Sequence, residues 1–171
     1  MKTVLINASN SKNSINGQLL NYVNKLITNT EVLDLTKYNI PIYNMDIETS
    51  DFPEDIITLA KVLKKYDSYI ISSPEHNGYP TAFFKNILDW LSRHDPKFLG
   101  NNSSVFLMST SPGAGGGANH LKQLQHTLSY FGGNVKTTYS LPSFYDNFKE
   151  GRIIDEQLNK ELEQTIKNFI S

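Results

Sequence analysis

Residues 68–93 read SYIISSPEHNGYPTAFFKNILDWLSR, and this stretch decides the fold. Its first six residues form a short apolar run of the kind that parallel sheets bury on both faces. A turn rich in proline, asparagine and glycine follows. From residue 81 to residue 93, apolar side chains then recur at helical spacing, namely Phe84, Ile87, Leu88 and Leu91. The stretch is therefore predicted to be a strand, a turn and a helix.

The same order of strand and helix recurs on both sides of this unit. Short apolar runs predict strands at residues 2–8, 31–35, 68–73, 103–108 and 135–139. Periodic segments predict helices at residues 15–28, 53–63, 81–93, 118–131 and 155–170, and residues 36–52 are expected to form a long loop. Strands that alternate with helices predict a parallel sheet with helices on both faces.

Right-handed crossover connections leave few strand orders for such a sheet, and 2-1-3-4-5 is the commonest for five strands. We therefore expect a flavodoxin-like, doubly wound α/β fold in which residues 1–171 form one domain. Ligands of such sheets bind where the strand order reverses, which is here between the first and third strands. The loops to examine are therefore 9–16, 74–80 and 109–117.

The composition narrows the class of protein. The 171 residues include no cysteine, which excludes disulfides, thiolate metal sites and a cysteine nucleophile. Sixteen Lys and Arg against 17 Asp and Glu give a net charge of −1, without the basic excess of a nucleic-acid binder. No window is apolar enough to span a membrane, and residues 1–6 run into a strand without a signal sequence. We expect a cytoplasmic protein with a small-molecule ligand.

The first loop, SNSKNSIN at residues 9–16, places hydroxyl and amide groups between a strand and the start of a helix. Free backbone N–H groups and the helix dipole favour an anion there. The alternative is that Ser14 is only a helix N-cap and that the other residues form a solvated turn. With several Ser and Asn donors at the first βα turn of this topology, we favour a phosphate site.

The second loop, SPEHNGYP at residues 73–80, has prolines near both ends, and Gly78 permits a positive φ or a close backbone approach. Such a loop can present N–H groups to a flat heterocycle while His76 covers the face of that ring. The alternative is a plain turn of proline, asparagine and glycine.

The third loop, STSPGAGGGA at residues 109–118, contains a nominal G-x-G-x-x-A pattern. It follows the fourth strand rather than the first, and no acidic residue stands about 20 positions later, so a Rossmann dinucleotide site is rejected. A glycine run whose backbone closes against the edge of a ring fits better, and a flexible surface loop is the alternative.

Other candidate residues carry less weight. Lys85 and Asp89 are spaced to form a surface ion pair, and Trp90 is expected in the core. The histidines at positions 94, 120 and 126 show no metal-ligand pattern and are expected at the surface, so we predict no metal site. No catalytic acid, base or nucleophile is visible, and we therefore expect a cofactor to carry the chemistry.

The motif P-E-H-N-G-Y-P at 74–80 with F-K-N-I-L-D-W at 84–90 resembles the signature of the NADPH-dependent FMN reductase family, small flavoproteins that reduce azo compounds, quinones and chromate. The segments 8–16, 41–44 and 109–117 are similar to that family in place and order. The sequence departs from the family's pattern at two positions. Ser11 stands where the family has a phosphate-loop arginine, and His76 stands where it has another aromatic residue.

The resemblance implies bound FMN, whose phosphate contacts Ser9, Ser14 and Asn16 and whose ring edge contacts Glu75, His76 and Asn77. The loop near Ser109, Ser111 and Gly113 would close the far end of the ring. The full set of expected cofactor-binding residues is Ser9, Ser11, Ser14, Ile15, Asn16, Pro74, Glu75, His76, Asn77, Gly78, Ser109, Ser111 and Gly113. FMN is expected rather than FAD, because the first loop receives a terminal phosphate and leaves no room for an adenylate.

The resemblance also implies ping-pong turnover, in which NADPH or NADH reduces the flavin and a flavin, quinone, azo compound or similar small acceptor takes the electrons. It further implies a homodimer or homotetramer, with Tyr38 and Tyr43 expected to be exposed and available for the subunit contact. Two alternatives stay open: a flavodoxin-like electron carrier, and a non-redox domain that binds a phosphorylated ligand.

Overall fold

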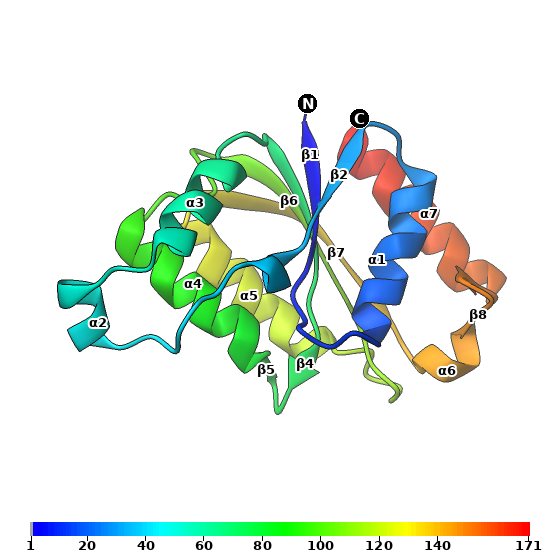
Figure 1. Cartoon of the computed structure of the whole chain (residues 1–171). Coiled ribbons are helices and arrows are strands. Elements are labelled where there is room, and N and C mark those ends of the chain that lie inside the picture. The colour runs from blue at the N-terminus through cyan, green and yellow to red at the C-terminus, as the bar shows by residue number, and fades with distance from the viewer. Residues whose placement is uncertain (1) are drawn as a thin grey trace.

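The computed structural model of the chain describes residues 2–171 and is built around a five-stranded parallel sheet (Figure 1). In spatial order the strands are β2 (Thr30–Leu33), β1 (Thr3–Asn7), β3 (Ser68–Ser72), β6 (Ser103–Thr110) and β7 (Gly133–Leu141). Counted along the chain, this is the order 2-1-3-4-5. The prediction of a flavodoxin-like α/β fold is confirmed.

Helices cover both faces of the sheet, as predicted. On one face lie α1 (Ile15–Leu26) and α7 (Glu156–Ile170), and on the other lie α3 (Glu54–Leu63), α4 (Ala82–His94) and α5 (Ala118–Tyr130) (Figure 1). Successive side chains of a strand point to opposite faces. Leu5 and Ile70 therefore belong to the cluster under α1 and α7, whereas Ile6 and Ile71 belong to the cluster under the other helices.

Several short elements were not predicted. The expected loop at 36–52 contains a 3₁₀ turn, η1 (Leu35–Lys37), and a short helix, α2 (Met45–Ser50). The expected turn at 74–80 is a hairpin of β4 (Glu75–His76) and β5 (Tyr79–Pro80). Between β7 and α7 lie α6 (Phe144–Asn147), β8 (Phe148–Lys149) and β9 (Arg152–Ile153). Elements of two to six residues are too short to show a hydrophobic period.

The motif at 84–90 anchors the segment 41–43 to α4. Trp90 is buried, as predicted, and its Nε1–H donates to the carbonyl of Pro41 at 2.8 Å. Asn86 donates to the same carbonyl at 2.9 Å and accepts the N–H of Tyr43 at 2.7 Å. Tyr43 also packs edge-on against Trp90. Tyr43 and Tyr38 are half-buried, so the expectation that both are exposed is wrong.

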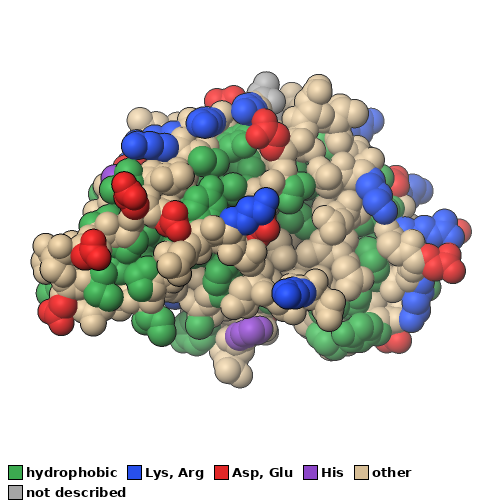
Figure 2. All heavy atoms as spheres, viewed as in Figure 1, with side chains coloured by type: hydrophobic (Ala, Val, Ile, Leu, Met, Phe, Trp, Pro, Cys, Tyr) green, Lys and Arg blue, Asp and Glu red, His purple; other side chains and the backbone are tan. Residues whose placement is uncertain are grey.

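The carboxyl ends of the strands lie at the edge of the sheet from which the β4–β5 hairpin projects, and both chain ends lie at the opposite edge (Figure 1). Acidic and basic side chains are interspersed over the face drawn in Figure 2, in keeping with the net charge of −1. The predicted surface pair of Lys85 and Asp89 forms at 2.6 Å. None of the helices in residues 2–171 is long and apolar enough to cross a membrane.

Candidate functional site

The three loops meet around a hollow of about 270 Å³ at the carboxyl edge of the sheet. The predicted residues in its lining are Ser9, Ser11, Ser14, Ile15, Asn16, Pro74, Glu75, His76 and Ser111. The predicted residues Asn77, Gly78, Ser109 and Gly113 are not in this lining. The residues that the sequence analysis missed are Asn13, Thr110, Pro112 and Tyr145.

The first loop leads from β1 into α1 and offers hydrogen-bond donors to the hollow. Ser14 is the N-cap of α1, and its Oγ accepts the N–H of Gly17 at 3.1 Å. The N–H groups of Ile15 and Asn16 make no hydrogen bond within residues 2–171. The Oγ of Ser9 accepts the N–H of Ser11 at 3.2 Å, which leaves the hydroxyl proton of Ser9 for a ligand. Free N–H groups at a helix start favour an anion.

The side chain of Asn16 is hydrogen-bonded within the protein. It is 1% exposed, and its Nδ2 donates to the carbonyl of Thr110 at 2.9 Å. Its Oδ1 accepts the N–H of Thr110 at 3.0 Å and the hydroxyl of Ser72 at 3.1 Å. These bonds occupy the Asn16 side chain and join the first loop to β3 and β6, and the predicted contact of Asn16 with phosphate stays a prediction. Its backbone N–H remains available to a ligand.

The second loop is a tight hairpin rather than a plain turn. Asn77 and Gly78 have φ values of 54° and 82°, and positive φ at both central residues is typical of a type I′ turn. The expectation of a positive φ at Gly78 is therefore confirmed. The hairpin places Glu75 and His76 beside the first loop and directs Asn77 toward a second hollow, of about 720 Å³, between α4 and α5.

His120 is fully buried under this hairpin, so the expectation that it lies at the surface is wrong. Its Nδ1 lies 2.7 Å from the carbonyl of Gly117, which can only accept, so we assign the proton to Nδ1. Its Nε2 then accepts the hydroxyl of Ser73 at 3.0 Å. The carboxylate of Glu75 accepts the backbone N–H of His120 at 3.3 Å and lies 3.5 Å from Nδ1.

Burial decides the charge of His120. Loss of hydration lowers the pKa of the imidazole, whereas the carbonyl of Gly117 and the carboxylate of Glu75 act in the opposite direction. The net direction is downward, so the imidazole is neutral near pH 7. His120 therefore ties the second loop to the start of α5 as a neutral hydrogen-bonding group.

The third loop closes the far side of the hollow with backbone rather than with free hydroxyls. Ser109 is fully buried, and its Oγ donates to the carbonyl of Ser73 at 2.8 Å. Ser111 lines the hollow and bonds the carbonyl of Gly113 at 3.2 Å, and that carbonyl also accepts the N–H of Ser143 at 2.9 Å. The side chain of Ser109 is therefore held within the protein, and the predicted contact of Ser109 and Gly113 with the ligand stays a prediction.

Tyr145 brings an aromatic ring to the hollow from α6 and is 60% exposed. Ser143, just before this helix, has a φ of 44°, which is uncommon for a residue other than glycine. No periodic pattern in the sequence indicates so short a helix. Within the described residues, no group of three or more His, Asp or Glu side chains is placed to hold a metal ion.

Comparison with known proteins identifies the family of this chain. The model of the NADPH-dependent FMN reductase family matches residues 1–146. The chain belongs to this family. The quinone reductase of Escherichia coli K12 is 31% identical over 130 residues, which cover 72% of this chain and 69% of that protein. The NADPH:quinone oxidoreductase of Arabidopsis thaliana is 30% identical over 142 residues, which cover 80% of this chain and 70% of the relative.

A solved structure extends this family likeness to the whole fold. The flavoenzyme NAD(P)H:(acceptor) oxidoreductase FerB of Paracoccus denitrificans superposes with a TM-score of 0.80 at 25% identity. The superposition covers 99% of this chain and 96% of FerB. The azoreductase AzrA shares the fold at 17% identity, with a TM-score of 0.65 over 98% of this chain and 99% of that one. This FMN reductase-family chain therefore has the family's fold along nearly its full length.

Proposed function

We propose that this chain holds FMN at the three loops and uses NADPH or NADH to reduce flavins, quinones, azo compounds or similar small acceptors. The observation that carries the proposal is the pair of free N–H groups, of Ile15 and Asn16, at the start of α1 and at the switch point of the sheet. The names of the relatives agree with this activity.

The residues present fit such a cofactor. The N–H groups of Ile15 and Asn16, with the hydroxyls of Ser9 and Ser14, would hold the phosphate. The polypeptide around Glu75 and the ring of Tyr145 would border the isoalloxazine. Bound FMN would supply the redox chemistry, namely the capacity to accept hydride from the nicotinamide and to pass electrons to the acceptor.

The protein would contribute position and electrostatics. Asn16 and His120 fix the relative places of the three loops from beneath, so that the donors of the site need no rearrangement when charge develops. No side chain of the chain needs to act as a nucleophile. His76 is exposed on the hairpin, beside both the 270 Å³ hollow and the 720 Å³ hollow, where an acceptor could approach.

We also propose a homodimer or homotetramer. The 720 Å³ hollow between α4 and α5, and the side chains of Ile42 and Met45, which are 85% and 66% exposed, offer apolar surface for a second copy. Light scattering on the purified protein, coupled to size-exclusion chromatography, measures the mass directly. A monomer at micromolar concentration would contradict this part of the proposal.

The activity is tested by absorption spectra of the FMN-loaded protein before and after anaerobic addition of NADPH and then of a quinone. The proposal expects bleaching of the flavin bands by NADPH, their return with the quinone, and parallel lines in double-reciprocal plots. Bound FMN without NADPH oxidation would favour an electron carrier. Protein that cannot be loaded with FMN would favour a non-redox domain that binds a phosphorylated ligand.

A further inference from the structure

The 270 Å³ hollow offers a phosphate neutral hydrogen-bond donors but no permanent positive charge. Its lining, which lies entirely within the described residues, includes no lysine or arginine, and its ionisable side chains are Glu75, His76 and Tyr145. A phosphate monoester carries a charge of about −1.5 to −2 at pH 7. The carboxylate of Glu75 has the same sign as this ligand, so a cation from outside the lining would stabilise the bound phosphate.

Lys12 is the basic residue of the first loop, and it stands between two residues that line this hollow, Ser11 and Asn13. The N–H of Ser14 donates to the carbonyl of Ser11 at 3.2 Å and closes a turn with Lys12 and Asn13 at its centre. The turn holds the backbone of Lys12 just before the N-cap of α1. Its flexible side chain is therefore anchored beside the free N–H groups at the start of this helix.

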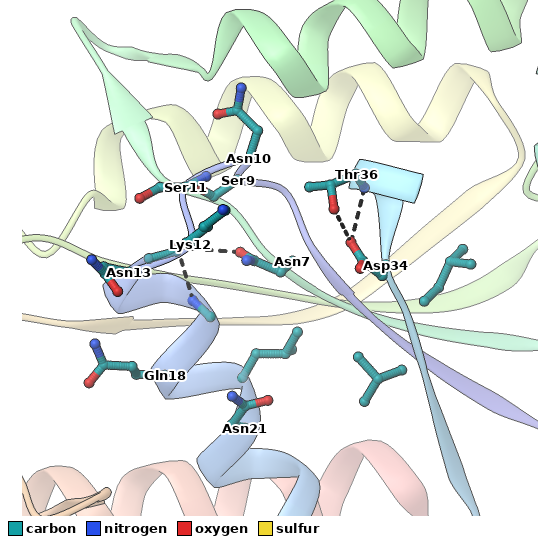
Figure 3. A pocket seen from close by; sticks show the side chains of 15 residues that line it. Asn7, Ser9, Asn10, Ser11, Lys12, Asn13, Gln18, Asn21, Asp34 and Thr36 are labelled. Carbon is teal, nitrogen blue, oxygen red and sulfur yellow. Dashed lines mark hydrogen bonds between the residues drawn. The ribbon is translucent and has the colours of Figure 1, made fainter. Parts of the chain in front are cut away.

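The side chain of Lys12 lies on the other side of the first loop from the 270 Å³ hollow. It lines a hollow of about 710 Å³ between that loop, α1 and the end of β2 (Figure 3). The two hollows share Ser9, Ser11, Asn13 and Ser14, so the first loop is a wall common to both. Lys12 needs only to turn about this wall to reach a phosphate on the other side.

Asp34 is the other charged side chain in the lining of the 710 Å³ hollow, and it lies across the hollow from Lys12 (Figure 3). Hydrogen bonds from the hydroxyl and the N–H of Thr36 lower the pKa of Asp34, so its carboxylate is ionised. Lys12 nevertheless forms no salt bridge within residues 2–171, and its side chain is exposed. The ammonium group of Lys12 is therefore not already paired with a carboxylate of the protein.

The charge of Lys12 is the opposite of what the dipole of α1 favours. Cations destabilise the start of a helix, and α3 and α7 instead carry the acidic residues Glu54, Asp55 and Glu156 in their first turns. The first turn of α1 has no acidic residue. A lysine before the N-cap adds to the positive end of the dipole, and both favour an anionic ligand.

We propose that Lys12 neutralises the phosphate of the bound flavin and so helps to select FMN over riboflavin. The inference rests on the proposed function, which places the phosphate at the first loop. The neutral donors of the loop fix the position of the phosphate, and Lys12 supplies the positive charge that they lack.

The test is a titration of the apoprotein with FMN and with riboflavin, followed by quenching of flavin fluorescence. Lys12→Gln should weaken FMN binding about three- to tenfold and leave riboflavin binding unchanged, because riboflavin has no phosphate. Lys12→Arg keeps the positive charge and should retain most of the affinity for FMN. Lys25→Gln, at the other end of α1, makes the same change in net charge and should leave both affinities unchanged.

The dependence of binding on salt gives a readout that a merely structural role of Lys12 would not move. Raising the ionic strength from about 0.01 M to about 0.15 M shortens the Debye length from about 30 Å to about 8 Å. The affinity of the wild type for FMN should fall over this range, and that of Lys12→Gln should fall less. The affinity for riboflavin should stay constant in both proteins.

Several results would overturn the inference, and they differ in what else they reject. If FMN binds equally well to the wild type and to Lys12→Gln, the neutral donors hold the phosphate alone and the proposed function stands. If Lys12→Gln weakens FMN and riboflavin equally, Lys12 supports the loop rather than the phosphate. If His76→Gln weakens FMN and Lys12→Gln does not, the positive charge comes from the hairpin.

The wild-type protein separates these results from a failure of the proposed function. If the wild-type apoprotein binds no FMN, the phosphate site at the first loop is rejected, and the proposed function falls with the inference.

Discussion

The first loop and a polar cluster beneath the second loop, formed by Ser73, Ser109 and His120, both place polar side chains at the same edge of the sheet. The first loop offers donors to a ligand, whereas the cluster holds the fold together. In the first loop, Ser11 is exposed and Ser9 keeps a hydroxyl proton that the protein does not use. In the cluster, Ser73, Ser109 and His120 are each 0% exposed and hydrogen-bonded within the protein. The difference between a binding group and a structural one is whether the protein already uses the side chain's donor, and not the type of residue.

A donor that faces solvent contributes mainly when a ligand arrives, whereas a buried polar group that loses its partner costs about 1–3 kcal/mol in the folded state itself. Substitutions in the first loop should therefore change FMN affinity more than stability. Substitutions in the cluster should change stability more than affinity.

The largest effect is expected where the backbone passes closest to the cluster, at Gly117. Its φ is +75°, and a Cβ atom there would lie 2.2 Å from the Oγ of Ser109. Left-handed backbone and overpacking together predict that Gly117→Ala lowers the free energy of unfolding by about 3 kcal/mol, measured by urea denaturation. Gly78→Ala is the control: its φ is +82°, but no atom lies within 4 Å, so a loss of about 1 kcal/mol is expected. Equal losses at the two positions would contradict the crowding argument.

Asn16 lies in the first loop but is buried, so its substitution should lower stability, as substitutions in the polar cluster do. Asn16→Ala removes hydrogen bonds to both the N–H and the carbonyl of Thr110, and we expect a loss of about 2–3 kcal/mol in the free energy of unfolding. Asn13→Ala, at an exposed position of the same loop, should stay within about 0.5 kcal/mol of wild type. Normal stability of Asn16→Ala with strongly reduced FMN affinity would contradict this structural role and indicate that the side chain itself contacts phosphate.

Much of the fold could be predicted because its strands are short apolar runs and its helices are periodic. Ser14 could be identified as a cap because a hydroxyl residue precedes an amphipathic helix. The burial of Asn16 could not be predicted, since its partner Thr110 is 94 positions away and only the folded sheet brings the two together. Tyr145 was not predicted as a site residue because a helix of four residues shows no hydrophobic period in the sequence.

His120 is a miss that the sequence could have prevented. It precedes Leu124 by four residues and Leu128 by eight, and all three lie on the buried face of α5. A histidine on the apolar face of an amphipathic helix should be expected inside, with its two ring nitrogens in need of partners.

Ser14 represents the first loop, where a substitution should change FMN affinity more than stability. Ser14→Ala removes a cap, at a cost of about 1 kcal/mol in stability. It also removes a hydroxyl that would donate to the phosphate, and hydrogen bonds to charged groups are worth about 1.5–3 kcal/mol, so FMN affinity should fall about 10- to 100-fold. Fluorescence titration measures the affinity, and Ser14→Thr, which keeps the hydroxyl, should recover most of it. Unchanged affinity in the alanine variant would remove the first loop from the phosphate site.

The smallest effect concerns pH, and it tests whether the buried cluster depends on a neutral histidine. Burial lowers the pKa of His120 in the folded state, while an unfolded chain titrates histidine near about 6.5. Below that pH the unfolded state therefore binds more protons than the folded state. The contribution of His120 to stability is complete above about pH 6.5 and is lost as the pH falls toward the folded-state pKa.

Among the groups of residues 2–171 that face the imidazole, only Glu75 carries charge. Its carboxylate, 3.5 Å from Nδ1, favours the protonated form and limits the loss of stability. Urea denaturation between pH 5 and 8 should show a steeper fall in stability on the acid side for wild type than for His120→Gln, which keeps a hydrogen-bonding side chain without the titration. Glu75→Gln should steepen the wild-type fall, because it removes the charge that opposes burial. Parallel curves for wild type and His120→Gln would show that His120 does not couple protonation to folding.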